Sequence, residues 1–279
     1  IVLKKSNIYS VIVAIIIARG GSKSIPRKNV LAFRGKPLIA WPIDLAKSID
    51  RIDRIIVSTD DDEIMRIAKQ YSAEIPFKRP AELADDETPT LPVLQHCIKY
   101  LEEQEKYKAD MVLLLYPTAP LLRKERVEEA LDLFETKGCN SVISVVKDWG
   151  RFWKKDGEQY TLFHPTERVN RQYYEPLYRE NGAIYVSRHE VLMKMNKLVD
   201  DTNIQFLIME DGENIDIDNP EDFVKAETDE VLEASLKRLP KESYLLRHDE
   251  LLNKLKKRRD NIPAAMTEYY RFVNRIVDI

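Results

Sequence analysis

The sequence predicts an α/β protein built on a doubly wound, mostly parallel sheet. Segments typical of strands alternate with segments typical of helices through most of the 279-residue chain. The first strand, residues 11–17, is a continuous apolar run rich in β-branched residues, which indicates a strand buried on both faces. Because parallel strands are joined by crossover connections, this alternation favours a parallel sheet with helices on both sides.

The predicted elements follow a regular order along the chain. Segments of helical spacing separate the strands, and Pro117 and Pro120 close the third strand. We expect strands at residues 11–17, 54–58, 111–115 and 141–146, and helices at residues 38–48, 63–71, 92–105 and 124–137.

Two segments depart from this alternation. Residues 152–160 carry Asp156-Gly157 between strand-like residues, which predicts a β-hairpin that projects from the sheet. From Phe223 to the end there is no glycine, and the helical pattern is broken only at Pro240 and Pro263. We therefore expect a C-terminal helical extension added to a complete α/β unit.

Composition excludes several classes of protein. The chain has 44 Lys and Arg against 47 Asp and Glu, a net charge of -3, so it has no overall field for nucleic acid or an anionic membrane. Its longest apolar run, residues 11–18, is far shorter than the roughly 20 residues that a membrane span needs. Without a secretory pattern and with only two cysteines, Cys97 and Cys139, we expect a cytoplasmic protein whose thiols are structural.

The segment after the first strand indicates a phosphate-binding loop. Gly20 and Gly21 allow a sharp turn with exposed amides, at the strand end where open parallel sheets bind ligands. Four cationic side chains of this loop would supply donors to a polyphosphate: Arg19, Lys23, Arg27 and Lys28. The spacing fits neither a Walker loop nor a dinucleotide fingerprint, and Pro26 prevents an immediate regular helix.

A second candidate site lies near the end of the α/β pattern. Asp216 and Asp218 are two residues apart on a predicted strand, so their side chains share a face and can offer oxygens to one Mg²⁺. An exposed acidic edge is the alternative interpretation. Asp60 is a weaker candidate, because the acidic residues 60–63 also fit the first turn of a helix. The four histidines have neither metal spacing nor the order of a catalytic triad.

Residues 18–29 resemble the signature of the acylneuraminate cytidylyltransferases, the CMP-sialic acid synthetase family, in which this loop wraps the triphosphate of CTP. Five further stretches are similar to that family in the same order: Ile56-Val57-Ser58-Thr59-Asp60, Arg79-Pro80-Ala81-Glu82-Leu83, Pro117-Thr118-Ala119-Pro120, Arg179-Glu180-Asn181-Gly182-Ala183-Ile184-Tyr185 and Ile215-Asp216-Ile217-Asp218. The resemblance implies a fold of the nucleotide-diphospho-sugar transferase type. It also implies a cytidylyltransferase domain at residues 10–228, with a hairpin insert at about residues 149–178 that swaps between the subunits of a homodimer. The helical extension, residues 229–279, lies outside the resemblance.

The resemblance also implies roles for individual residues. The catalytic residues are Arg19, Lys28, Asp216 and Asp218, and the last two would hold Mg²⁺. CTP would be bound by Ala18, Gly20, Gly21, Ser22, Lys23, Asn29, Arg79 and Thr90. The sugar acid would be bound by Tyr116, Thr118, Arg171, Arg179, Asn181 and Tyr185.

The implied activity is transfer of CMP from CTP to the anomeric hydroxyl of a nonulosonic acid, a sialic-acid-like sugar, with release of pyrophosphate. Tyr116 stands where the family commonly has a glutamine that helps hold the sugar, Ala119 replaces a serine, and the following arginine is displaced to Arg123. These departures leave the sugar open among sialic, legionaminic and pseudaminic acids. An octulosonate or phosphonate acceptor is an alternative, and a non-catalytic nucleotide-binding scaffold is a third.

Overall fold

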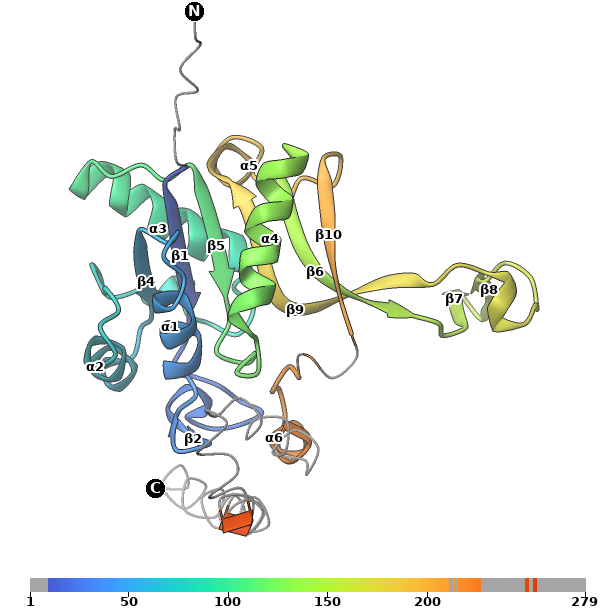
Figure 1. The fold of residues 1–279 in the computed structure, drawn as a ribbon, viewed down its shortest axis with the longest axis horizontal. Coiled ribbons are helices and arrows are strands. Elements are labelled where there is room, and N and C mark those ends of the chain that lie inside the picture. Colours follow the sequence, from blue (N-terminus) through green and yellow to red (C-terminus); the bar gives the residue numbers. More distant parts are fainter. Residues whose placement is uncertain (1–9, 211–212, 214, 227–248, 251–252, 255–279) are drawn as a thin grey trace, which may run out of the picture.

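The computed structural model describes residues 10–210, 213, 215–226, 249–250 and 253–254, and a six-stranded sheet forms its centre (Figure 1). The strands run in the order β10-β6-β9-β5-β1-β4. Their bounds are β1 Ile12–Ile17, β4 Arg54–Ser58, β5 Met111–Leu115, β6 Ser141–Asp148, β9 Leu177–Arg188 and β10 Ile204–Met209. β1 pairs in parallel with β4 and β5, and β10 pairs in parallel with β6. β9 runs antiparallel between β5 and β6. The α/β fold with a mostly parallel sheet is therefore confirmed.

The sequence pattern does not predict β9 or β10. β9 lacks a clean alternation because Asn181 and Gly182 interrupt it, and Gly182 has a φ of 70°, a conformation that glycine adopts without strain. The pairing with β6 shifts register between Ile143 and Val145. An irregular strand of this kind, stabilised by neighbours on both sides, has little local signal.

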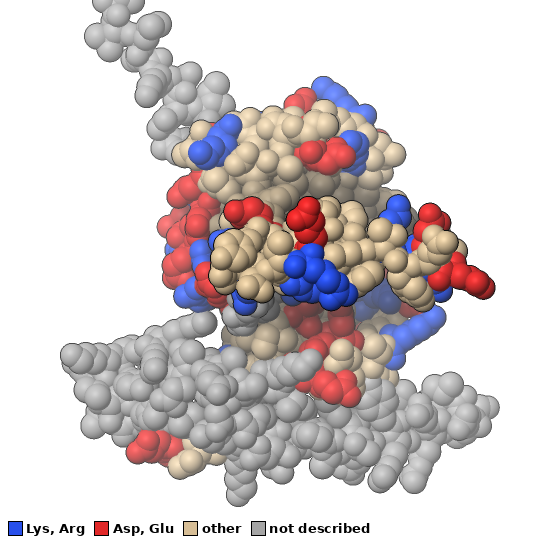
Figure 2. Space-filling model, turned by 90° about the vertical axis from the view of Figure 1, so that its right-hand side faces the viewer, with Lys and Arg blue, Asp and Glu red and all other residues tan. Residues whose placement is uncertain are grey.

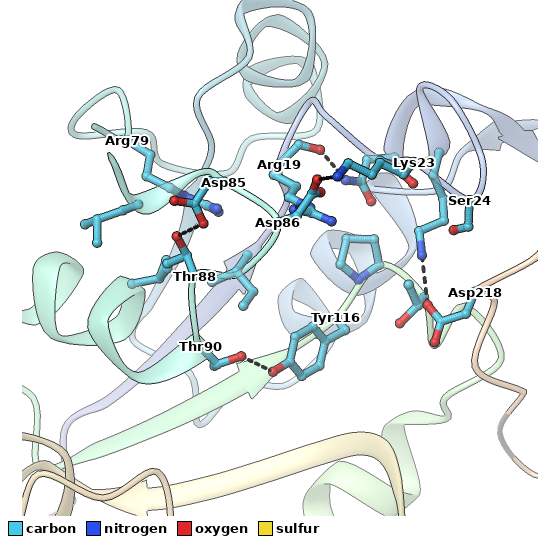
Figure 3. Close-up of a pocket in the computed structure, with 18 residues that line it drawn as sticks. Arg19, Lys23, Ser24, Arg79, Asp85, Asp86, Thr88, Thr90, Tyr116 and Asp218 are labelled. Carbon is cyan, nitrogen blue, oxygen red and sulfur yellow. Dashed lines mark hydrogen bonds and ion pairs between the residues drawn. The ribbon is translucent and has the colours of Figure 1, made fainter. Parts of the chain in front are cut away.

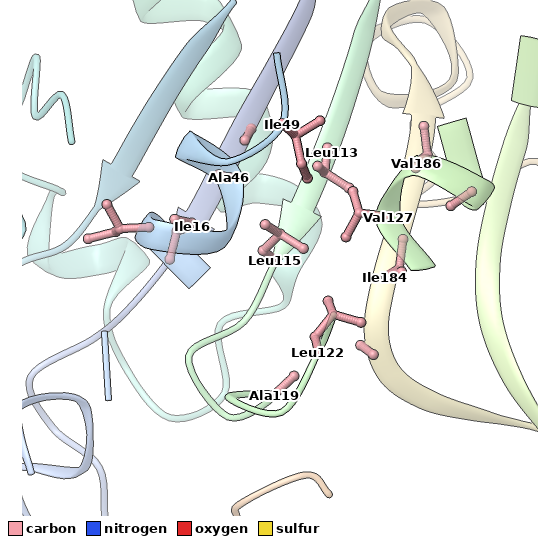
Figure 4. Packing of buried hydrophobic residues seen from close by; sticks show 14 of the residues in the cluster. Ile16, Ala46, Ile49, Leu113, Leu115, Ala119, Leu122, Val127, Ile184 and Val186 are labelled. Atoms are coloured by element: carbon pink, nitrogen blue, oxygen red, sulfur yellow. The ribbon is translucent and has the colours of Figure 1, made fainter. Parts of the chain in front are cut away.

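Helices cover both faces of the sheet. α1 (Ala40–Lys47), α2 (Asp62–Gln70) and α4 (Lys124–Lys137) share one apolar cluster with the sheet, part of which is shown in Figure 4. α3 (Thr90–Glu105) and α5 (His189–Met193) pack on the opposite face. This burial on both faces explains why the residues of β5 are apolar without alternation and are all buried.

A third apolar cluster lies beyond the carboxyl ends of the strands. It combines the short hairpin β2 (Ala32–Phe33) and β3 (Lys36–Pro37) with α6 (Pro220–Ala226). Ile25, Phe33, Ile217 and Phe223 are buried together there. This cluster brings the loop after β1 against residues 215–218, which lie almost two hundred positions later in the chain.

A two-stranded arm projects from the sheet (Figure 1). β7 (Phe152–Asp156) and β8 (Gln159–His164) pair antiparallel around the Asp156-Gly157 turn, between the ends of β6 and β9. Trp153, Tyr160 and Phe163 on the arm are 50%, 64% and 58% exposed. Viewed end-on, much of the arm's surface carries neither basic nor acidic residues (Figure 2).

The predicted C-terminal extension, residues 229–279, lies almost entirely outside the described residues. Among the residues that the structure describes, no helix is long and apolar enough to cross a membrane.

Candidate active site

A cleft of about 460 Å³ opens at the carboxyl ends of β1, β4 and β5, which is the edge where the sequence places the phosphate loop. Its lining includes ten of the predicted site residues: Arg19, Ser22, Lys23, Lys28, Asn29, Arg79, Thr90, Tyr116, Thr118 and Asp218. The remaining eight do not line it: Ala18, Gly20, Gly21, Arg171, Arg179, Asn181, Tyr185 and Asp216.

Hydrogen bonds to neighbouring segments hold the loop after β1 in shape. The amide of Gly20 donates to Oδ1 of Asp60 at 3.0 Å, so that amide is directed at a carboxylate rather than into the cleft. The buried Asn29 donates from Nδ2 to the carbonyl of Arg19 at 2.9 Å, which ties the two ends of the loop together. Pro26 is followed by one 3₁₀ turn, Lys28–Val30, and not by a regular helix, as the sequence predicts.

Arg27 does not have the phosphate-binding role that the sequence suggests. Its guanidinium makes two hydrogen bonds to Asp61 and another to Glu63, and it does not line the cleft. Because Asp61 accepts from Arg27 and from the first amides of α2, its pKa lies below the usual range. Asp61 follows the end of β4, and its charge attracts the guanidinium away from the cleft.

The other cations of the loop face the cleft. Nη1 of Arg19 lies 2.5 Å from Oδ1 of Asp86, and Lys23 pairs with the other oxygen of the same carboxylate (Figure 3). Nζ of Lys28 donates to Oδ1 of Asp218 at 3.0 Å and to the carbonyl of Ile217 at 2.9 Å. Lys28 thus joins the phosphate loop to the acidic segment.

Arg79 is a buried cation at the cleft wall. It is 5% exposed, and its guanidinium donates to the hydroxyl and carbonyl of Ser58. Burial lowers the pKa of Arg79 below its usual value, because the charged guanidinium has lost water. A buried charge is costly unless an opposite charge lies close to it, so an anion bound in the cleft would stabilise the guanidinium of Arg79.

Asp216 and Asp218 lie in an extended segment that is not a strand, which corrects the sequence-based expectation. Ile217 between them is buried in the third cluster, and only Asp218 lines the cleft. Asp216 is exposed to solvent when the whole residue is considered. Its carboxyl group, however, accepts a hydrogen bond from the hydroxyl of Thr118 and lies beside Gly182. Desolvation and the neighbouring charge of Asp218 raise the pKa of Asp216 above its usual range.

Two tyrosines of the predicted sugar site meet at the edge of the cleft. Tyr116 shares a hydrogen bond of 2.9 Å with the hydroxyl of Thr90, and its ring is 6.1 Å from that of Tyr185. The hydroxyl of Tyr185 donates to Glu180 at 2.8 Å. Burial raises the pKa of both phenols, so both are uncharged near pH 7.

The structure does not bring the other predicted sugar residues into the same protomer's cleft. Arg171 stacks on Trp149 at the arm, with 4.7 Å from its guanidinium carbon to the ring centroid. Nε of Arg179 lies 3.4 Å from Oδ2 of Asp148, and its side chain is 60% exposed. Asn181 accepts a hydrogen bond of 2.6 Å from Ser144 inside the sheet.

Sequence reasoning missed the acidic side of the cleft. Asp85, Asp86 and Thr88 line it, from the segment between Arg79 and α3. Their position directly after the Arg79-Pro80 motif could have marked them as candidate site residues. The sequence did not indicate which side chains they contact. Both cysteines are buried, and burial raises the pKa of Cys97 to about 12, which disfavours the reactive thiolate form. Within the described ranges no group of three or more His, Cys, Asp or Glu side chains could hold a metal ion.

Comparison with known families fits this geometry. The family model described as cytidylyltransferase matches residues 13–239, most of the chain, and covers the whole sheet except the first residue of β1. The chain belongs to the cytidylyltransferase family. It is therefore a nucleotidyltransferase that uses CTP as co-substrate.

Several curated cytidylyltransferases resemble the chain. A pseudaminic acid cytidylyltransferase of Campylobacter jejuni is 43% identical over 176 residues, which cover 61% of this chain and 75% of the relative. A CMP-N,N'-diacetyllegionaminic acid synthase of Legionella pneumophila is 31% identical over 222 residues, 77% of this chain and 94% of the relative. An N-acylneuraminate cytidylyltransferase of Oncorhynchus mykiss is 34% identical over 66% of this chain and 43% of the relative.

Solved structures share the cytidylyltransferase fold at low sequence identity. A CMP:2-keto-3-deoxy-manno-octonic acid synthetase in complex with CTP aligns with a TM-score of 0.60 at 18% identity, over 78% of this chain and 97% of the other. A 4-diphosphocytidyl-2C-methyl-D-erythritol synthase from Anaerococcus prevotii aligns with a TM-score of 0.59 at 21% identity, over 82% of this chain and 97% of the other.

Proposed function

We propose that this chain transfers the CMP group of CTP to the anomeric hydroxyl of a nonulosonic acid and releases pyrophosphate. The observation that carries the proposal is the contact between Lys28 and Asp218, which joins a cationic loop to an acidic segment at one cleft. Membership of the cytidylyltransferase family supplies CTP, and the relatives named above act on three nonulosonic acids.

The cationic residues would stabilise the leaving group. Breaking the bond between the α- and β-phosphates leaves negative charge on pyrophosphate, and fixed cations lower the energy of that charge. Arg19, Lys23 and Lys28 all line the cleft, so these three would neutralise the departing phosphates. Arg79, buried at the opposite wall, would bind the cytosine and ribose end of the nucleotide.

Asp216 and Asp218 fit a magnesium-nucleotide site. Mg²⁺ is commonly held by one or two carboxylates and completes its shell with waters and phosphate oxygens. Desolvation raises the pKa of Asp216, and Thr118 and Lys28 offset this only in part, so a bound cation would stabilise the charged carboxylate. When bound, the ion would polarise the α-phosphate. The ammonium of Lys28, now on Asp218, would share that carboxylate or move to a phosphate oxygen.

The acceptor site would be completed by a second subunit. Tyr116 and Thr118 line the cleft and Tyr185 packs against Tyr116. Arg171 instead stacks on Trp149 and Arg179 pairs with Asp148, at the base of the projecting arm. Two arginines could clamp the sugar carboxylate only if the arm reaches another subunit's cleft. The exposed aromatic side chains of the arm support burial against a second copy of the chain. We therefore propose a homodimer, with residues 149–178 as its insert and residues 10–228 as the catalytic domain.

A pyrophosphate-release assay tests the proposal. The full chain is incubated with CTP and Mg²⁺ and, in parallel reactions, with sialic, legionaminic and pseudaminic acids. Release that depends on one of these acids is expected. Release only with an octulosonate or a phosphonate would identify that compound as the acceptor, since arginines bind both carboxylates and phosphonates. Binding of CTP without release in any reaction would indicate a nucleotide-binding scaffold.

A further inference from the structure

The carboxylate of Asp86 forms ion pairs with Arg19 and Lys23, two of the cations that we assign to the triphosphate. Its Oδ1 lies 2.5 Å from Nη1 of Arg19, and its Oδ2 pairs with Nζ of Lys23. Figure 3 shows the carboxylate of Asp86 beside both side chains. One carboxylate thus places an oxygen on each of two cations, which is the arrangement that two oxygens of a phosphate would adopt.

We propose that Asp86 is an internal competitor of CTP, which must be displaced from Arg19 and Lys23 before the triphosphate binds. The inference rests on the proposed placement of the triphosphate at these two side chains. Asp86 and a phosphate are both anions, and they cannot occupy the same N–H groups together. Leaving Asp86 in place beside a bound triphosphate would also bring like charges close together.

The local structure allows the displacement. Asp86 lies in the loop of residues 84–89, between the 3₁₀ turn Ala81–Leu83 and α3. The side chains of Asp86 and Arg19 are 30% and 32% exposed, and that of Lys23 is 80% exposed. Ion pairs this open to water are weak, so a triphosphate with several charges can replace them. Lys23 and Arg19 hold the pKa of Asp86 below its usual range, so the competitor stays ionised at neutral pH.

Asp85 supplies a matched control on the same loop. It also lines the cleft, but its Oδ1 accepts from the hydroxyl of Thr88 at 2.6 Å and from the amide of Glu87 at 3.0 Å. Asp85→Asn removes the same formal charge from the same cleft without releasing a cation of the phosphate loop. Comparison with Asp86→Asn therefore separates specific competition from general repulsion of an anion.

Calorimetric titration of the full chain tests the proposal. CTP and inorganic triphosphate are titrated separately, without acceptor and with divalent metal removed by EDTA, so that no turnover occurs. Asp86→Asn should bind both ligands roughly tenfold more tightly, because two cations are released together. Asp86→Glu, which keeps the charge, should remain near the wild type, and Asp85→Asn should change affinity less than Asp86→Asn.

Other outcomes overturn the proposal. Unchanged affinity in Asp86→Asn would show that no competition exists, and weaker affinity would show that Asp86 orients the two cations for the nucleotide. An equal gain in Asp85→Asn would reduce the effect to general repulsion. A further outcome separates this proposal from the proposed function. If no variant binds CTP but Asp86→Asn still binds inorganic triphosphate more tightly, Asp86 competes with a phosphate ligand and the assignment of CTP to the cleft is wrong.

Discussion

The α-carbon of Gly20 lies directly against the carboxylate of Asp61. A Cβ atom on residue 20 would be 2.8 Å from Oδ2 and 2.9 Å from Cβ of Asp61, closer than such atoms approach in proteins. Asp61 cannot readily move away, because it accepts from Arg27 and caps α2 through the amides of Glu63 and Ile64. One carboxylate therefore fixes the phosphate loop at residue 20 and at residue 27.

Gly20→Ala should weaken CTP binding by roughly tenfold, because the added methyl group displaces the loop that presents Arg19 and Lys23. The neighbouring Gly21 provides the control, since a Cβ there would meet nothing within 4 Å. Titration of CTP into both variants checks the prediction. Equal affinities in Gly20→Ala and Gly21→Ala would mean that the loop tolerates the shift.

Asp218→Asn should lower the rate of CMP transfer by roughly a thousandfold if this carboxylate holds the magnesium ion, since the charge at the α-phosphate is then unsupported. The fold should be retained, because the side chain is 67% exposed. Asp132→Asn is the matched control: Asp132 is 69% exposed and also pairs with a cation, Arg51, but lies on α4. Steady-state rates across a magnesium titration are the measurement, and near-normal activity at limiting magnesium would exclude the role.

Arg171→Ala should weaken binding of the sugar acid by roughly 2–5 kcal/mol. CTP binding should be unchanged, because Arg171 lies at the arm and not in the cleft. Kinetics with each substrate varied in turn separate the two effects. Lost CTP affinity with unchanged acceptor kinetics would reverse the assignment.

Mixing Arg171→Ala with Asp218→Asn should restore about a quarter of wild-type activity if the arm completes the partner's site, since half of randomly mixed dimers then have one intact site. The chains must exchange subunits, which native mass spectrometry of the mixture verifies. If the arm serves its own protomer, every site in the mixture carries one defect and no activity returns.

Asp200 should make folding stability depend on acid pH. It is 3% exposed, and its oxygens accept from the hydroxyl and amide of Thr202 and from the side chain of Asn140. These bonds lower its pKa from 3.8 to about 2, so its stabilisation is complete above pH 3.8 and is lost as the pH falls toward 2. Thermal unfolding between pH 5 and 2 should therefore change less steeply in Asp200→Asn than in the wild type. In Asp201→Asn, whose side chain is 72% exposed, the profile should stay close to that of the wild type; identical profiles in all three proteins would contradict the assignment.

The sequence by itself determined four strands of the sheet and the place of the cleft. β1, β4, β5 and β6 are short apolar runs bounded by turn residues, and such runs carry their conformation and burial locally. Gly20, Gly21 and Pro26 likewise determined that a loop and not an immediate regular helix follows β1, because the backbone preferences of glycine and proline act within a few residues. The residue motifs indicated the family for the same reason, since each is a contiguous stretch.

Only the tertiary structure decided which partner each charged side chain has. Arg27 and Lys23 are equivalent in the sequence, yet one pairs with Asp61 at the start of α2 and the other with Asp86 before α3. Lys28 meets Asp218 because the third apolar cluster buries Ile25 and Ile217 together. β9 and β10 also became strands through pairing with β6, and β9 through β5 as well. Contacts of this kind depend on which segments the folded sheet brings together. The spacing of residues along the chain does not predict these contacts.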